Sequence, residues 1–472
     1  MSSTLGAMFF IGNGFYIEHL IAGQIGYQLF PLGAVILYAL TDRRSKYIYN
    51  GAIIATVITL MIFQAGFYLI VILILSLSIT LPVLYLYKAK VLNLRNITLT
   101  AISAAVLCAA ITASKIYAVA AFMSHFPRQI FDVYDIGLFQ AGIGLIVQIL
   151  GTMTLAPIFI ATQNDPALLT GTFSSITGAG YGLWETDIGL SPVLIIFLFI
   201  GFAFTIAHLR KSTRINLNRS LLVGLILLAI PVWITIEMTL ARGIVYTATK
   251  QFPILRSLHV NVRFAAAFLL PLIIVGTLQL HRFFLKNPKQ SYFAAFTFLS
   301  IAALFSFFSL SREVHIREFN VRPSNIIHEK IQSGSRFPVT DIGDISPWVG
   351  FSEQASSIKP YEPIFGYKLE EFNHQIRFGS VFETENGYFN MTNPESFVFP
   401  EANDLDPFER FKVSERDKLE TFLERRQPEW NIPMAQKILN KLSLIALIFT
   451  AGILITTKFA ELMPAVKRKN TI

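Results

Sequence analysis

The sequence predicts a mainly α-helical, polytopic membrane protein: a bundle of about eight to ten transmembrane helices with a mixed α/β domain before the last helix. Of its 472 residues, 53% are hydrophobic and only 15% are charged, whereas soluble domains average about 25% charged residues. Several apolar runs approach the ~20 residues that a membrane-crossing helix needs. The net charge of +9 comes from Lys and Arg in short loops between these runs, as the positive-inside rule expects. No nucleic-acid partner is therefore predicted.

The first part of the chain predicts four elements. Residues 1–24 are too short and too polar for a full span, so Ile25–Leu40 is the first predicted span. Ile48–Leu86 is too long for one crossing, and Gln64–Gly66 near its middle predicts two helices joined by a tight turn. Ile97–Met123 follows as the next span. The basic loops that flank the helix pair are expected to be cytoplasmic, which places its tight turn on the outer face.

The middle of the chain departs from this regular pattern. Gly137–Ile160 is apolar, yet a Gly/Ser/Thr-rich stretch follows it instead of a basic loop. We therefore expect it to pair with a partial insertion around Ala167–Ile176, or to form re-entrant or interfacial helices, which membranes tolerate where protein or a wet cavity surrounds them. The remaining predicted spans are Val193–Ala207, Leu221–Met238, Ala265–Leu280, Ser291–Leu310 and Leu442–Phe459.

Composition divides the chain into three parts. Residues 1–310 form the predicted membrane core, 311–436 an extracytoplasmic globular domain, and 437–472 a final span with a basic cytoplasmic tail. The globular domain is predicted because charged and polar residues alternate with aromatic ones from residue 311 onward. Its expected elements are three short strands and one helix with Ser414 as N-cap: Arg336–Thr340, Ser380–Thr384, Ser396–Phe399 and Ser414–Arg426.

The stretch Gly180–Pro192 carries the first candidate site. Glu185 and Asp187 lie beside Trp184, immediately before a long apolar run. A carboxylate at the mouth of a membrane helix is costly to desolvate and usually faces water, a cavity or a partner. Glu185 is therefore a candidate catalytic acid that activates an acceptor hydroxyl, with Trp184 and Asp187 as substrate-binding residues. The alternative is an interfacial charge that favours the start of the following helix.

Asp132 and Asp135 form a second acidic pair. Carboxylates three residues apart share one face of a helix and are able to hold a divalent cation, Mg²⁺ or Mn²⁺, together with a phosphate. Asp132 is thus a second candidate catalytic acid, and both aspartates are candidate metal ligands. The alternative is a solvated, amphipathic interfacial helix.

Basic side chains on the predicted outer face need an explanation, because they oppose the positive-inside trend. Arg256, His259 and Arg263 are candidates for binding a phosphate, which arginine recognises through bidentate hydrogen bonds. A continuous helix would place the two arginines, seven residues apart, on one face. Arg128 and Lys115 are further substrate-binding candidates. Lipid headgroup contact or snorkelling at the interface is the alternative.

Other chemistries leave no signature in the sequence. There is no Walker loop, dinucleotide fingerprint, zinc-ligand spacing or nucleophile elbow. Cys108 is the single cysteine, so an iron–sulfur centre and an intrachain disulfide are not predicted. Glu18 and His19 are either catalytic or simply interfacial polar residues in a short terminal segment.

Several short motifs occur in a defined order. Phe126-Pro127-Arg128 follows Lys115, Trp184-Glu185 precedes a long helix, and Pro253…Leu255-Arg256…Arg263-Phe264 precedes another. The polar part adds Tyr361–Tyr367, Asn386–Pro394 and Phe399-Pro400-Glu401. This order, over roughly residues 15–411, resembles YfhO-like bacterial membrane proteins, which belong with the GT-C class of glycosyltransferases.

The resemblance implies a bacterial inner (plasma) membrane enzyme that transfers a sugar from a polyprenyl-phosphate donor on the extracytoplasmic face. Arg256 and Arg263 would then neutralise the lipid phosphate. The catalytic acid of that class usually lies in the first outer loop, and no such helix and loop precede Ile25. The resemblance therefore implies a shortened chain, or an acid such as Glu18 or Asp132 in its place. The alternative is a non-catalytic protein, namely a lipid-linked glycan transporter or an assembly subunit.

Overall fold

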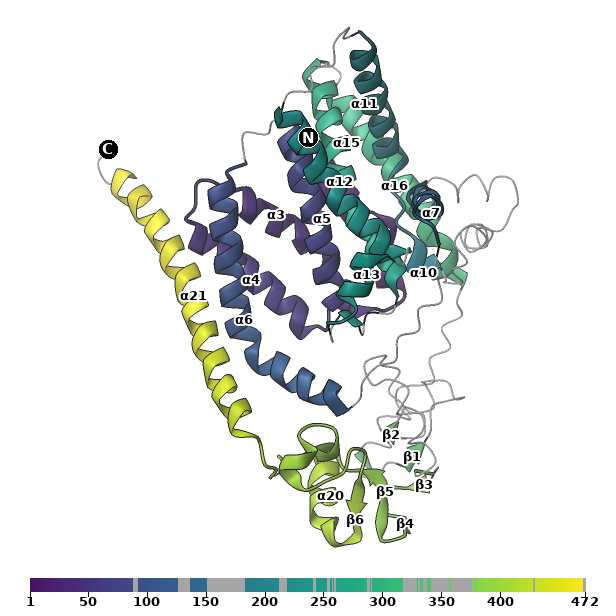
Figure 1. Cartoon of the computed structure of the whole chain (residues 1–472), viewed down its shortest axis with the longest axis vertical. Coiled ribbons are helices and arrows are strands. Elements are labelled where there is room, and N and C mark those ends of the chain that lie inside the picture. The colour runs from purple at the N-terminus through teal and green to yellow at the C-terminus, as the bar shows by residue number, and fades with distance from the viewer. Residues whose placement is uncertain are drawn as a thin grey trace. The chain divides into compact units, whose positions relative to one another are not determined.

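Helices dominate the described part of the chain (Figure 1), as predicted. A computed structural model describes residues 1–87, 92–125, 136–150, 183–211, 219–240, 243–252, 260–286, 291–316, 379–427 and 429–469, with short pieces at 255–256, 258, 289, 329, 332–333, 338–340, 356–357 and 376–377. The chain divides into two compact units. Unit 1 comprises Met1–Ala109, Phe131–Arg317 and Ile448–Ile472, and unit 2 comprises Ala110–Ile130 and Glu318–Leu447.

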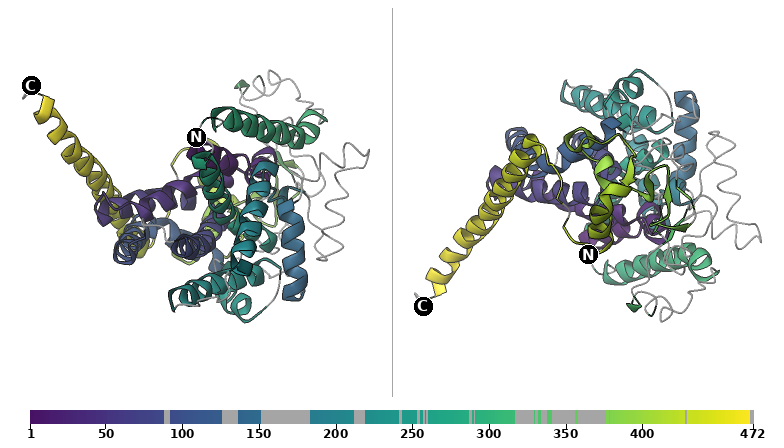
Figure 2. Two further views of the ribbon diagram at one scale, coloured as in Figure 1. Left: turned by 90° about the horizontal axis from the view of Figure 1, so that it is seen from above. Right: turned by 90° about the horizontal axis from the view of Figure 1, so that it is seen from below.

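Unit 1 contains most of the helices, which Figure 2 shows from above and below. Helix α6 (Leu94–His125) begins in unit 1 and ends in unit 2. The other elements are α1 (Ser2–Ile11), α2 (Gly14–Ile21), the 3-10 turns η1 (Ile25–Tyr27) and η2 (Phe30–Leu32), α3 (Gly33–Thr41), α4 (Tyr47–Phe63), α5 (Phe67–Leu86), α7 (Leu138–Leu150), α10 (Leu183–Thr186), α11 (Pro192–Lys211), α12 (Arg219–Thr239), α13 (Ile244–Thr249), the 3-10 helix η4 (Asn261–Phe268), α15 (Leu269–Lys286) and α16 (Ser291–Ile316).

The described residues include five helices that are long and apolar enough to cross a bilayer, judged by length and composition. They are Phe67–Leu86, Leu94–His125, Leu221–Thr239, Asn261–Lys286 and Met434–Thr457. Six further apolar helices are shorter, with 10–17 residues each. The chain is therefore a helical membrane protein, although the long helices in its described part are fewer than the about eight to ten spans predicted from length.

The helix pair predicted within Ile48–Leu86 is confirmed. Helices α4 and α5 are joined at Gln64–Gly66, where Ala65 adopts a left-handed φ of 58°. A Cβ atom on Gly66 would lie 3.1 Å from the carbonyl oxygens of both Met61 and Gly26, so a side chain here would force the backbone to shift by a few tenths of an ångström.

The predicted span Ile25–Leu40 lies within a shorter apolar helical stretch, Ile25–Thr41, whose first part is irregular. The segment forms the turns η1 and η2 and then the nine-residue helix α3. Pro31 lies at the start of η2, and proline lacks the N–H that would continue a preceding helix. Hydropathy alone did not reveal this interruption.

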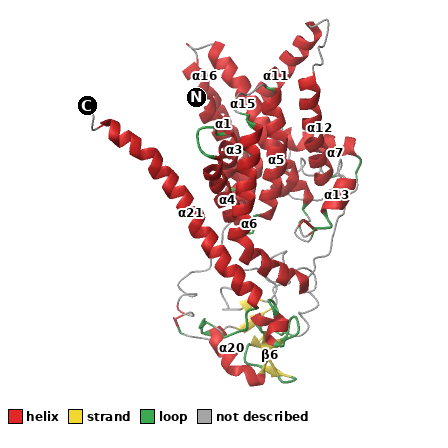
Figure 3. Cartoon of the chain, turned by 60° about the vertical axis from the view of Figure 1, so that its left-hand side comes forward, coloured by secondary structure: helices red, strands yellow, loops and turns green. Residues whose placement is uncertain are grey.

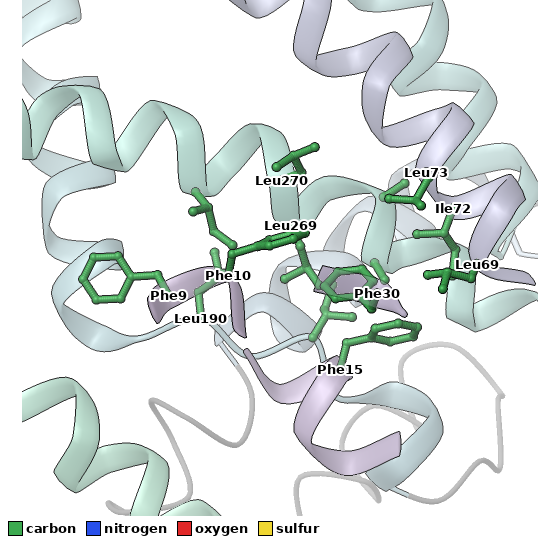
Figure 4. Packing of buried hydrophobic residues seen from close by; sticks show 14 of the residues in the cluster. Phe9, Phe10, Phe15, Phe30, Leu69, Ile72, Leu73, Leu190, Leu269 and Leu270 are labelled. Atoms are coloured by element: carbon green, nitrogen blue, oxygen red, sulfur yellow. The ribbon is translucent and has the colours of Figure 1, made fainter. Parts of the chain in front are cut away.

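The N-terminal segment contributes to the core of unit 1. Phe15 and Phe30 are almost fully buried, and their ring centroids lie 5.5 Å apart. They join a cluster that includes Leu69 of α5 and Leu269 of α15 (Figure 4). Burial of each such side chain contributes about 1.5–3 kcal/mol. The same core therefore holds α2, which carries His19, and α5, which carries Tyr68, in place together with the start of α15.

Unit 2 contains all the described strands, in two three-stranded sheets with orders β2-β1-β3 and β4-β5-β6 (Figure 3). The turn Asn386-Gly387 has positive φ at both residues and connects β4 to β5, as expected for a type I′ hairpin. The elements are β1 (Pro338–Thr340), β2 (Ser356–Ser357), β3 (Gly379–Ser380), β4 (Thr384–Glu385), β5 (Tyr388–Thr392), β6 (Arg410–Lys412), the 3-10 turns η6 (Pro394–Ser396), η7 (Pro400–Asn403) and η8 (Val413–Glu415), and α20 (Arg416–Leu423). Helix α21 (Met434–Lys469) begins in unit 2 and ends in unit 1.

Two local predictions in unit 2 are wrong. Ser396–Phe399 is not a strand, because Ser396 ends η6 and Phe399 has a left-handed φ of 59°. Ser414 is not the N-cap of α20. It lies inside η8, so that Glu415 takes the N-cap position.

A polar ladder joins the end of α6 to the start of α21 within unit 2. The Ser114 hydroxyl donates to the Asn440 side-chain oxygen, and the Ser114 backbone N–H donates to the Ser443 hydroxyl at 3.1 Å. The Gln436 side-chain amide donates to the Ser114 hydroxyl at 2.9 Å. Because apolar helices gain little from hydrophobicity inside lipid, such interhelical hydrogen bonds stabilise their association.

Candidate functional site

The segment that contains Glu185 and Asp187 is fixed by two other elements of unit 1. The backbone N–H of Gly14, at the start of α2, donates to the Gly189 carbonyl at 2.9 Å. The side-chain amide of Gln148, on α7, donates to the Thr186 carbonyl at 3.0 Å. Helix α10 has only four residues, so these contacts with α2 and α7, rather than its own helical bonds, hold both carboxylates in position.

Glu185 and Arg263 form a buried ion pair. Arg263, on η4, donates from Nε and Nη2 to the two carboxylate oxygens of Glu185. The two side chains are 9% and 12% exposed. The structure thus brings together the acid and one of the arginines that the sequence placed on the same face, in the bidentate geometry that gives the strongest charged hydrogen bonds.

Two tyrosines surround the guanidinium. Nη1 of Arg263 donates to the Tyr27 hydroxyl at 2.9 Å. The guanidinium carbon lies 5.4 Å from the ring centroid of Tyr27 and 4.8 Å from that of Tyr68, as in cation–π contacts. The Tyr68 hydroxyl also accepts a hydrogen bond from the backbone N–H of Val260 at 2.8 Å. Val260 directly precedes η4, so this bond holds the start of η4 against α5.

His19 of α2 is the third polar group at the pair. Its Nδ1 lies 2.7 Å from the Phe15 carbonyl oxygen, which only accepts, so we assign the ring proton to Nδ1. Its Nε2 lies 4.0 Å from Oε2 of Glu185. Burial, together with the Arg263 charge, lowers the pKa of His19 to about 3. The imidazole is therefore neutral at physiological pH, with its lone pair on Nε2.

Asp187 is a second buried acid with different properties. Its Oδ1 accepts the Gly189 backbone N–H at 2.6 Å. Burial raises the pKa of Asp187 to about 7, although this hydrogen bond opposes the rise. A Cβ atom on Gly14 would overlap the carboxylate, so glycine is required there. The site therefore contains one carboxyl group that titrates near neutral pH.

The structure separates Arg256 from Arg263. No helix runs from one to the other, because Leu258 and Val260 are non-helical and η4 begins at Asn261. Arg256 is exposed, whereas Arg263 is buried in its ion pair. The interpretation that both arginines share one helical face is therefore wrong.

The remaining predicted site residues are Lys115, Trp184 and residues outside the described part of the chain. Lys115 is partly buried in the section of α6 that belongs to unit 2. The backbone of Trp184 belongs to α10. Four predicted site residues lie outside the described part of the chain: Arg128, Asp132, Asp135 and His259. The side chain of Trp184 also lies outside it. Among the described residues no group of three or more His, Cys, Asp or Glu side chains could hold a metal ion, and the cation at Asp132 and Asp135 stays a prediction.

Sequence reasoning missed Tyr27 and Tyr68 and left His19 undecided. The two tyrosines lie in apolar segments and resemble ordinary core residues. The adjacent pair Glu18-His19 was the available signal, because two ionisable side chains interrupt an otherwise apolar N-terminal segment. Both are buried.

No family model, curated protein or solved structure matches the chain. The fold and the site define a helical membrane protein with a buried site of two carboxyl groups, one arginine and one neutral histidine. The resemblance to YfhO-like proteins stays a prediction, and functional assignment depends on the chemistry of these side chains.

Proposed function

We propose that the protein is an integral membrane glycosyltransferase of the GT-C type, which transfers a sugar from a polyprenyl-phosphate donor on the extracytoplasmic face of a bacterial plasma membrane. The observation that supports this proposal is the bidentate Glu185–Arg263 pair, with Asp187 two residues further along the same segment. Arginine suits a phosphate leaving group, and a carboxylate suits the activation of an acceptor hydroxyl.

Arg263 retains hydrogen-bonding capacity for a phosphate. A guanidinium has five N–H groups. The described contacts use the Nε and one Nη2 hydrogen toward Glu185 and one Nη1 hydrogen toward Tyr27. One N–H on each terminal nitrogen would then be directed at the donor phosphate. Its charge would stabilise the negative charge that develops on the leaving group.

Asp187 suits the role of general base better than Glu185 does. Both oxygens of Glu185 already accept hydrogen bonds from Arg263, whereas the pKa of Asp187, about 7, lies near the operating pH, as efficient general bases require. In the proposed step, the acceptor oxygen bonds to the sugar anomeric carbon and its proton passes to Asp187. The bond from that carbon to the phosphate breaks, and polyprenyl phosphate leaves with the bonding electrons.

The alternative is a non-catalytic membrane protein, a transporter of lipid-linked glycans or an assembly subunit. One observation favours it: Glu185 and Arg263 are both buried and neutralise each other, as in a purely structural ion pair.

The test is transfer of labelled sugar from polyprenyl-phosphate donors by the full chain in nanodiscs. Asp187→Asn should lower the rate by about 10²–10⁴-fold, the usual contribution of a general base, and Arg263→Lys should also lower it. Arg282→Lys, at an exposed arginine of α15, is the matched control. Equal transfer by parent and by folded Asp187→Asn and Arg263→Lys variants would refute the assignment of the site. A parent that transfers no sugar from any donor would favour the non-catalytic alternative.

A further inference from the structure

Two hydrogen-bond acceptors face each other at the buried pair. Nε2 of His19 and Oε2 of Glu185 are 4.0 Å apart. Neither has a proton to give, because the His19 proton is on Nδ1 and the carboxylate is paired with Arg263. Nε2 is fully buried and has no hydrogen-bond partner among the described residues. Leaving a buried acceptor without a hydrogen bond is unfavourable, so this position favours a donor from outside the chain.

Both acceptors are held in fixed orientations. The imidazole packs against the rings of Phe15 and Tyr27, with centroids 4.2 and 4.1 Å away, and its Nδ1–H donates to the Phe15 carbonyl. The Glu185 carboxylate is held by Arg263 on both oxygens. A carboxylate oxygen has two lone pairs, so Oε2 is able to accept a second hydrogen bond.

We propose that His19 Nε2 and Glu185 Oε2 form a two-acceptor site for O–H donors. One oxygen atom is able to lie about 2.8 Å from both acceptors, the usual length of an O–H hydrogen bond, so that a water molecule donates one hydrogen to each. Adjacent hydroxyls of a sugar ring supply the same two O–H groups, one for each acceptor. The chemistry is shared by the two sources, and the sugar case rests on the proposed glycosyltransferase function.

A neutral histidine suits this role. Because His19 stays unprotonated to about pH 3, its Nε2 remains an acceptor over the whole physiological range. The same property makes it a poor general base, since a base is most efficient when its pKa lies near the operating pH. We therefore assign His19 to sugar or water recognition and leave proton transfer to Asp187.

Nitrogen NMR of the full chain in nanodiscs tests the site without any assay of activity. The chain has eight histidines, and the His19 signals of a ¹⁵N-histidine sample are identified by their loss in His19→Gln. We expect an unprotonated, hydrogen-bonded Nε2. Magnetisation transfer from water to Nε2 before sugar is added would identify water, whereas a change only after addition of a methyl glycoside would identify sugar hydroxyls. A protonated Nε2, or one without a hydrogen bond under both conditions, would overturn the proposal.

Donor kinetics then separate the two proposals. If the site binds the sugar of the donor, His19→Phe should raise KM about tenfold or more, as loss of about 1.4 kcal/mol predicts, with a smaller change in kcat. His19→Gln keeps an acceptor oxygen and should recover part of the affinity. Transfer with an unchanged KM in His19→Phe would refute the sugar case alone. Absence of transfer in the parent would refute the glycosyltransferase proposal, while the NMR result still decides whether the site exists.

Discussion

Replacing Arg263 by Met should destabilise unit 1 by about 3–5 kcal/mol, the usual cost of removing one partner of a buried ion pair. The Glu185 and Arg263 side chains are 9% and 12% exposed, so solvent would compensate little of the uncovered carboxylate charge. Methionine has a similar length and fills the same space without a charge. The variant also loses the hydrogen bond to Tyr27 and the cation–π contact with Tyr68, together about 1–2 kcal/mol.

The double variant Arg263→Met/Glu185→Leu distinguishes lost charge pairing from lost packing. It removes both charges, and apolar replacement of a buried pair is often neutral or stabilising, so most of the single variant's loss should be recovered. Arg256→Met, at an exposed arginine of the same segment, should change stability by no more than about 0.5 kcal/mol.

The assay is equilibrium unfolding in mixed detergent micelles, analysed as a double-mutant cycle with Glu185→Leu as the second single variant. We expect a coupling energy of about 2 kcal/mol or more between the two residues. The reasoning fails if Arg263→Met costs less than about 1 kcal/mol, or if the double variant is as unstable as the sum of the two single variants, because the pair would then behave as a solvated surface contact.

Four further predictions follow from named contacts. In the His19→Gln background, stability should fall as pH rises from about 4 to 7, since unfolded Asp187 ionises near 3.9 but the folded carboxyl only near 7; adding Asp187→Asn to that background should flatten melting temperatures across this window. His19 acts oppositely, costing stability as pH falls from about 6.5 to 3, and His19→Gln should remove that loss. Gly14→Ala should cost about 1–3 kcal/mol of unfolding free energy, whereas Gly142→Ala, with open space around it, should be neutral or stabilising. Asn440→Leu should lower the melting temperature by removing the interhelical hydrogen bond that Ser114 donates, worth about 0.6–2 kcal/mol.

Helices that depend on length and hydropathy could be predicted from the sequence. The positions at which turns or unusual backbone angles interrupt a helix or strand could not. The pair α4 and α5 was predictable because a mainly apolar segment of 39 residues exceeds one crossing, and Gln64–Gly66 offers the turn. Ile25–Leu40 is also apolar, but it begins with the turns η1 and η2 before helix α3, with Pro31 at the start of η2. Phe399 adopts a left-handed φ that no strand propensity predicts.

The sequence predicted which residues of the candidate site lie on the same face of the membrane, but not the contacts between them. Topology placed Glu185 and Arg263 on one face of the membrane, and the structure pairs them across 78 positions of sequence. Their bidentate contact depends on the tertiary packing of α10 against η4 and α2. Hydropathy measures only whether a side chain prefers lipid or water, and it contains no information on contacts with other residues. It therefore assigned His19 to the interface as readily as to a site, although protein buries this side chain completely.

The short helix α2 determines where both acids lie, although it is too short to cross a membrane. Its first residue, Gly14, binds the Gly189 carbonyl and leaves space for the Asp187 carboxylate, and its last turn presents His19 to Glu185. Asn13 caps the helix through Tyr16 N–H, and Phe15 anchors it in the core. Because Arg263 comes from η4 instead, the phosphate-binding and hydroxyl-binding groups of the proposed site belong to different elements. Loss of one contact to α2 should therefore disturb Asp187 and His19 together, while Arg263 keeps its contacts with the two tyrosines.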